Sequence, residues 1–300
     1  MPLFSTWTNE AKQLKKRDFK NEKELQTFIE KNLEYLFGIR FVATEYSTSK
    51  NHWGRIDTLG LDENNSPVII EYKWWEKDNI INQGLFYLDW LVDHTGDFQI
   101  LTQNKLWMDV EVDFGSPRVL LIAQSFSKYD QYAINRMSEN IELWSYARYE
   151  NDLFELKLTA SSQAKTSTSS SKSQISKVNY DEYSVENHLE WKPEKVKELF
   201  YRLQEKIFAL ESDQNIEEIA RKIYISYRTS RAFLYMHIQS KWIKMHLIVD
   251  NKELDDPRWF GRDVSNIWHH GHWNTEVILR NMDDLEYVMK LIEQSYLQSI

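Results

Sequence analysis

Two predicted strands around a polar turn, residues 55–73, carry three charged side chains at positions where strand residues are usually buried: Asp57, Glu71 and Lys73. Burying a charge costs free energy unless the charge is paired or bound to a metal, so this placement calls for a chemical reason. The three residues are therefore the first candidates for a functional site.

Side chains alternate between the two faces of a strand, so Glu71 and Lys73 point the same way. Asp57 joins them if the connecting turn has an odd number of residues, which the polar turn permits. Carboxylate oxygens suit a hard cation such as Mg²⁺ or Mn²⁺. A lysine beside them can hold a water molecule, and the metal can lower the pKa of that water so that it attacks phosphorus. These residues predict hydrolysis of a phosphodiester bond.

The same residues resemble the signature of the PD-(D/E)XK nuclease superfamily, particularly its restriction-endonuclease-like, NucS-related members. The points of resemblance are Gly54-Arg55-Ile56-Asp57 and the apolar run that ends in Glu71-Tyr72-Lys73. The resemblance implies an α/β fold with a mixed sheet flanked by helices. It also implies a Mg²⁺- or Mn²⁺-dependent endonuclease that cuts DNA in repair, restriction or phage defence, with RNA as a further compatible substrate.

The resemblance assigns roles to individual residues of the hairpin. Asp57, Glu71 and the main-chain carbonyl of Tyr72 would hold the metal, and Lys73 would orient the attacking water. An edge hairpin that carries a surface aspartate and a Glu/Lys pair is the alternative account of the same residues.

Two helices flank these strands in the sequence. Residues 21–37 show apolar side chains at helical spacing, and Asn21 with Glu24 forms the pattern of a capping box. The resemblance implies a glutamate near the metal site in this helix, at Glu24; capping explains that residue equally well. Residues 78–92 form the second helix, where Gln83 and Tyr87 share one face.

The resemblance carries Gln83 over as a further catalytic residue near the metal site. Tyr87 is the looser match, and we assign it a contact with nucleic acid. An ordinary amphipathic helix with one polar residue is the alternative account of this segment.

Composition limits the class of protein. The chain has 300 residues and no cysteine, which excludes disulfides and cysteine-ligated zinc. Neither a signal peptide nor a membrane-spanning apolar run is found in the sequence, so we expect a cytoplasmic protein without membrane contact.

The net charge of −9 weighs against a nucleic-acid partner, so DNA binding must depend on local basic patches. The candidate patch is Lys15, Lys16 and Arg17, near the N-terminus; a solvated N-terminal arm is its alternative account. A homodimer would bring two active sites to a duplex, one for each strand that is cut.

We expect two domains joined by a linker. Residues 1–158 form the nuclease-like domain, and residues 159–186 form a flexible linker rich in Ser, Thr and Lys. Residues 187–300 form an α+β domain with an antiparallel meander, and they resemble a C-terminal module of unknown function that is sometimes labelled a predicted transport protein.

Two features of this second domain could bind ligands. The histidines of Trp268–Trp273 lie close together, but their spacing fits no common zinc pattern. Aromatic and basic residues along the meander, such as Tyr224, Tyr235 and Lys244, could stack bases, although sheets also carry aromatics for packing alone.

The competing hypothesis for the whole chain is a catalytically silent protein of the PD-(D/E)XK fold that binds nucleic acid or acts as a scaffold. The complete set of Asp57, Glu71 and Lys73 argues against it, because such a protein has no physical need for two unpaired acids in a strand.

Overall fold

The structure is a computed structural model that describes residues 3–6, 10–48, 54–74, 80–106, 110–162, 183–210, 216–221, 223–265 and 274–299. The chain divides into two compact units, residues 1–35 with 39–179 and residues 180–300 with 36–38. Within the described ranges, every helix is too short or too polar to cross a membrane.

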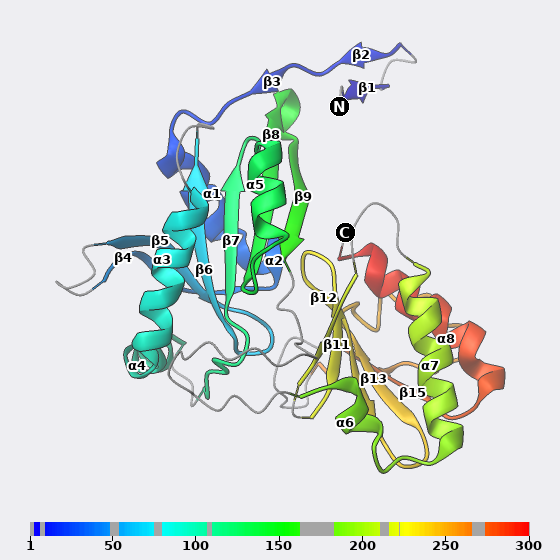
Figure 1. Ribbon diagram of the computed structural model, residues 1–300. Helices are drawn as coiled ribbons and strands as arrows, with labels where there is room; N and C mark the ends of the chain where they lie inside the picture. The colour runs from blue at the N-terminus through cyan, green and yellow to red at the C-terminus, as the bar shows by residue number, and fades with distance from the viewer. Residues whose placement is uncertain are drawn as a thin grey trace. The chain divides into compact units, whose positions relative to one another are not determined.

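A seven-stranded mixed sheet forms the centre of the first unit (Figure 1). Its strand order is β3-β8-β7-β6-β5-β4, and β9 also pairs with β8. Strands β6, β7 and β8 run parallel, and the other pairings are antiparallel. The strands are β3 (Lys16–Arg17), β4 (Arg40–Ser47), β5 (Arg55–Leu61), β6 (Pro67–Lys73), β7 (Arg118–Ala123), β8 (Asn140–Tyr149) and β9 (Phe154–Ser162).

Helices cover both faces of this sheet (Figure 1). Glu71 and Tyr72 are successive strand residues, so their side chains point to opposite faces. Glu71 accepts a hydrogen bond from α3 (Ile80–Asp93). The Tyr72 hydroxyl instead hydrogen-bonds the Thr58 hydroxyl, which donates to α1 (Glu22–Lys31) on the other face. The helices are α1 (Glu22–Lys31), α2 (Leu33–Phe37), α3 (Ile80–Asp93), α4 (Thr95–Leu106), α5 (Lys128–Ile134) and the 3₁₀ turn η1 (Glu150–Asp152); β1 (Phe4–Ser5) and β2 (Lys12–Gln13) form a separate two-stranded sheet.

The predicted mixed sheet flanked by helices is confirmed, with differences in detail. The helix expected over residues 21–37 is interrupted at Asn32, which ends α1 with a bond from its N–H to the Ile29 carbonyl. Strand β9 continues to Ser162, beyond the predicted start of the linker, because Ser162 hydrogen-bonds the backbone of Ile141. Helix α4 was not predicted, since it buries only Phe98 and Thr102 and so lacks an apolar stripe.

A buried ionic cluster joins the strands near the β5–β6 turn. The guanidinium of Arg118 lies 2.7 Å from Glu142 Oε1 and 3.5 Å from Asp62 Oδ2. Asp62 also accepts hydrogen bonds from the N–H groups of Asn64 and Ser66, which shapes the turn. Burial alone would lower the pKa of Arg118, but the two carboxylates outweigh it and raise the pKa. One guanidinium therefore offsets part of the charge of two carboxylates inside the fold.

The second unit consists of a six-stranded antiparallel sheet with the order β10-β11-β12-β13-β15-β14. Helices α7 and α8 pack on one of its faces around an apolar core (Figure 1). The elements are α6 (Val185–Leu189), α7 (Glu194–Phe208), β10 (Glu217–Ala220), β11 (Ile225–Arg228), β12 (Ala232–Ile238), β13 (Ile243–Leu247), β14 (Arg262–Asp263), β15 (Thr275–Leu279), the 3₁₀ turn η2 (Met282–Asp284) and α8 (Leu285–Leu297).

The predicted antiparallel meander and closing helix of this unit are confirmed. Most side chains proposed as a base-stacking surface are buried, including Tyr224 at 8% and Tyr235 at 1% exposure. They form part of the packing of the sheet, so the stacking interpretation is corrected for them.

Candidate active site

Strands β5 and β6 pair regularly from the turn up to Thr58 and Ile70, and beyond this point side chains replace the backbone ladder. The N–H of Asp57 donates to Glu71 Oε1 at 3.1 Å, and the N–H of Tyr72 donates to Asp57 Oδ2 at 3.1 Å. The backbone of each strand thus donates a hydrogen bond to a carboxylate of the other strand. The arrangement holds two acids together at the open end of the hairpin.

The two acids of this pair differ in their exposure to water, and Asp57 is half-buried. Glu71 is fully buried, and burial followed by the neighbouring Asp57 charge raises its pKa to about 9. Burial also raises the pKa of Asp57. Burial and the neighbouring charge therefore favour the protonated form of Glu71.

Lys73 belongs to the same site. Its ammonium lowers the pKa of both Asp57 and Glu71 by direct charge attraction. It lies two residues after Glu71 on β6, so its side chain leaves the strand on the face of Glu71. The structure thus brings the three residues of the sequence pattern together.

Helix α3 supports this pair from one side. Gln83 Nε2 donates to Glu71 Oε2 at 2.6 Å, which places Gln83 beside the acids as the sequence pattern predicted. The buried hydroxyl of Tyr87 donates to the Arg55 carbonyl and accepts from the Arg55 N–H. The contact between Tyr87 and nucleic acid is therefore corrected, because this hydroxyl substitutes for a missing strand partner of β5.

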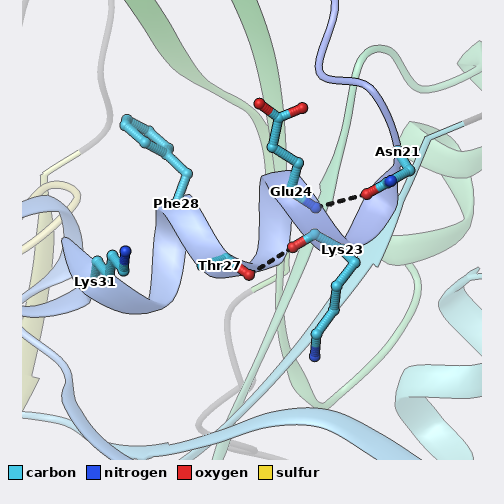
Figure 2. Close-up of a pocket in the computed structure, with 6 residues that line it drawn as sticks. All are labelled: Asn21, Lys23, Glu24, Thr27, Phe28 and Lys31. Atoms are coloured by element: carbon cyan, nitrogen blue, oxygen red, sulfur yellow. Dashed lines mark hydrogen bonds between the residues drawn. The ribbon is translucent and has the colours of Figure 1, made fainter.

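Glu24 does not join the pair. Its carboxylate accepts from the Lys20 N–H at 2.6 Å and lies 3.6 Å from Arg148, while its own N–H donates to the Asn21 side chain. Figure 2 shows Glu24 and Lys23 on opposite sides of α1, with Glu24 on the side of Phe28. Capping of α1 thus accounts for Glu24, and its predicted role near the metal is not supported by its position.

Other residues of α1 reach the hairpin instead. Gln26 Nε2 donates to the Asp57 carbonyl at 2.7 Å, and Glu30 accepts from the Thr58 hydroxyl at 2.7 Å. Glu22 accepts from the N–H of Trp74, directly after Lys73. Residues 22, 26 and 30 lie four apart on one helical face, and that spacing is the signal that could have identified them.

The predicted basic patch lies on the edge strand β3. Lys15, Lys16 and Arg17 are exposed, and Lys16 lies over the ring of Tyr149. Strand β3 pairs with β8 at residues 148–149, on the edge that β7 occupies at residues 140–145, so β3 lies beyond the end of β7. The patch is therefore on a different strand from the carboxylate pair, at the end of the strand that neighbours β6.

The atoms available as ligands are of the type that a hard divalent cation binds, because Asp57 and Glu71 present carboxylate oxygens. The main chain of Tyr72 lies against Asp57 and could supply a further oxygen. No cluster of three or more His, Cys, Asp or Glu side chains able to hold a metal exists in the described part of the chain. A cation here would need main-chain or water ligands as well. The histidines of Trp268–Trp273 lie outside the described residues.

Comparison with known proteins covers both units. Residues 185–299 match the family model described as "Domain of unknown function (DUF5655)", in agreement with the expected second domain of unknown function. A protein of Haemophilus influenzae described as "Uncharacterized protein" is 31% identical over 308 residues, covering 98% of this chain and 99% of that protein.

One solved structure also matches part of the chain. It is described as "crystal structure of a repair endonuclease from Pyrococcus abyssi", with 19% identity and a TM-score of 0.31. The match covers 43% of this chain and 48% of the endonuclease chain, about half the length of that protein. A likeness this weak carries no conclusion about activity.

Proposed function

We propose that the chain, which belongs to the same family as the uncharacterized Haemophilus influenzae protein, is a divalent-metal-dependent endonuclease that hydrolyses phosphodiester bonds of DNA. The observation that carries the proposal is the pairing of the buried Glu71 with the half-buried Asp57, with Lys73 beside them. Two acids in one buried position are unfavourable unless a proton or a cation neutralises them. Such a position is a favourable place for a cation to bind.

Asp57, Glu71 and the carbonyl of Tyr72 would hold the cation, which we expect to be Mg²⁺ or Mn²⁺. When bound, the metal would supply Lewis-acid stabilisation of the phosphate and a water of lowered pKa. The N–H of Tyr72 already lies 3.1 Å from Asp57 Oδ2, which supports a role for the main chain at this position.

The remaining residues orient the reactants. Lys73 would hold the attacking water and stabilise the negative charge that develops on the phosphate oxygens. Gln83 keeps Glu71 in place through its 2.6 Å hydrogen bond. Tyr87 and Gln26 hold the backbone of β5 on either side of Asp57, so the acid is fixed before substrate arrives.

Cleavage of DNA with purified variants tests the proposal. The wild-type chain should nick or cut DNA with Mg²⁺ or Mn²⁺, and Lys73→Ala should reduce the rate by about 100-fold or more, as expected for loss of transition-state charge stabilisation. Lys128→Ala, an exposed lysine on α5, is the matched control and should cleave at the wild-type rate. A folded Lys73→Ala protein that cuts at the original rate would exclude this mechanism.

Lys15, Lys16 and Arg17 extend the proposed DNA contact along the edge of the sheet. Replacing all three with glutamine should weaken binding to all DNA sequences alike and reduce its dependence on salt, because such contacts are to phosphate. A panel of duplex, branched, mismatched and single-stranded DNA, together with RNA, would identify the substrate. Nicking compared with double-strand cutting would show whether two copies of the chain act together.

A second candidate function is a catalytically silent scaffold or nucleic-acid-binding protein. It is favoured by the bonds that Asp57 and Glu71 already accept, because these bonds also close the diverging ends of β5 and β6. Titration with Mn²⁺ separates the two candidates. Absence of any affinity for Mn²⁺ would favour the scaffold.

A further inference from the structure

Glu45 on β4 lies opposite Asp57, between the paired residues Thr44 and Tyr46. Its carboxylate bridges two cations, with Lys23 Nζ at 2.5 Å and Arg55 Nη1 at 3.0 Å. The hydrogen bond and charge of Lys23, followed by the charge of Arg55, lower the pKa of Glu45 despite some desolvation. An ionised carboxylate thus holds together two cations beside the candidate active site.

Both cations are connected to Asp57. Lys23 donates to Gln26 Oε1 at 3.1 Å, and Gln26 donates to the Asp57 carbonyl. Arg55 precedes Asp57 by two residues on the same strand face, and its charge lowers the pKa of Asp57. An anion held by these two cations would lie next to the acid pair.

The backbone around this group is fixed. The Tyr87 hydroxyl bonds both the N–H and the carbonyl of Arg55, so the arginine has a rigid base and an exposed side chain. Glu45 has a φ of 46°, in the left-handed region that a residue with a side chain rarely adopts. A conformation of this kind persists only where surrounding contacts impose it, and such positions concentrate at functional sites.

We propose that Lys23 and Arg55 form a binding site for a backbone phosphate of the nucleic acid next to the bond that is cut, and that the Glu45 carboxylate takes the place of this phosphate in the free protein. The inference rests on the proposed function. Lysine and arginine are the usual partners of phosphate, and the arginine fork can bind two oxygens at once.

Glu45 then acts as an internal competitor. Both cations are more than half exposed, with side-chain exposures of 54% for Lys23 and 65% for Arg55, so substrate can reach them from solvent. Exposed ion pairs of this kind contribute little to stability, so a backbone phosphate can displace the carboxylate, favoured by the counterions that the nucleic acid releases on binding. Partners that lack closely placed anions would leave the Glu45 bridge intact.

Binding of a fluorescein-labelled 20-base-pair duplex to the full chain, with Ca²⁺ in place of Mg²⁺, tests the inference. Fluorescence anisotropy is recorded over a series of salt concentrations for the wild type and the variants Arg55→Gln, Lys23→Gln and Glu45→Gln. Each cation variant should weaken binding and reduce the slope of log affinity against log salt, by no more than about 0.9, the value for the one phosphate that the two cations share. Lys31→Gln, on the same helix as Lys23, is the matched control and should retain the wild-type slope.

Glu45→Gln should instead tighten binding by about two- to five-fold, the factor expected from removing one exposed ion pair. This gain should disappear in the double variant Glu45→Gln/Arg55→Gln, because the competitor and the site it occupies are then both absent. Thermal unfolding of each variant confirms that the fold is retained.

The outcomes separate this inference from the proposed function. Unchanged salt slopes for both cation variants, or unchanged affinity of Glu45→Gln, would overturn the phosphate site even if the enzyme cuts DNA. DNA binding with the expected slopes but no cleavage under Mg²⁺ or Mn²⁺ would support the phosphate site and reject the nuclease. A wild-type chain that does not bind the duplex would reject both.

Discussion

Two pairs of acids near opposite ends of the β5–β6 hairpin, one of them completed by Glu142 of β8, have different partners. Asp62 and Glu142 share the guanidinium of Arg118, and their remaining oxygens accept hydrogen bonds from the turn and from Trp144. Asp57 and Glu71 have no arginine between them, and their pKa values are raised. The first pair is partly neutralised within the fold by one shared guanidinium, whereas the second pair depends on a proton or on a cation from outside.

The difference indicates how a structural acid can be distinguished from a functional one. At the turn end, attraction to the two carboxylates outweighs burial and raises the pKa of Arg118, so the guanidinium stays charged between them. At the open end, Lys73 is close enough to lower both pKa values without cancelling the effect of burial. Burial of an acid is thus informative only together with the charge of its partners.

The largest expected effect concerns the neutralised pair. Arg118→Met should lower the free energy of unfolding by about 3–5 kcal/mol, because it leaves Asp62 and Glu142 buried without their cation. Urea denaturation followed by circular dichroism measures the change. Arg202→Met is the control, since Arg202 forms an exposed pair with Glu205 and should change stability by less than about 1 kcal/mol. Equal stability of the two variants would contradict the comparison.

Replacing an acid at the open end should have the opposite sign. The pKa of Glu71 is raised from 4.5 to about 9, so the stability supplied by its protonated form is complete below about pH 4.5 and is lost progressively as pH rises toward 9. Glu71→Gln remains neutral and should remove this decline, stabilising the metal-free protein at pH 8 by about 1–3 kcal/mol.

Thermal unfolding between pH 5 and 9 without divalent cations measures the effect of Glu71→Gln. Adding Mn²⁺ should stabilise the wild type but not the variant, because only the wild type retains both carboxylates. Parallel pH profiles for the two proteins would show that Glu71 is as well neutralised as the acids around Arg118.

A smaller effect is expected for the hydroxyl that supports the open end. Tyr87→Phe removes two hydrogen bonds to the Arg55 backbone and should cost about 1–2 kcal/mol. Hydrogen exchange at the Arg55 amide should accelerate, while the Asp62 amide at the turn end should not change. Equal exchange at Arg55 in both proteins would show that β5 does not need this support.

The sequence predicted the central part of the site but not its surroundings. Asp57, Glu71 and Lys73 were identifiable because period-two alternation on a short hairpin fixes the relative orientation of side chains. Gln83 was identifiable from the resemblance and from its place on the next helix. The positions of these side chains depend on local geometry, which can be predicted from the spacing of residues in the sequence.

The roles predicted for residues whose position depends on tertiary packing differ from those that the structure shows. Glu24 and Glu22 both lie in the first turn of α1, and only the docking of the helix shows that Glu22 approaches Trp74 while Glu24 pairs with Arg148. The hydroxyl of Tyr87 could equally have faced solvent. The bridge from Glu45 to Lys23 and Arg55 depends on a left-handed residue within a strand, which residue type does not predict.

The hairpin and α3 are consecutive in the chain, and together they contain most of the candidate site, from Arg55 to Tyr87. Contacts between neighbours in sequence form with little loss of loop entropy, whereas the parallel pairing of β6 with β7 must wait for a long connection to close. During refolding, amides of β5 and β6 should therefore gain protection from pulse labelling before those of β7. The candidate site would then form early in folding, and the other strands of the sheet would pair afterwards.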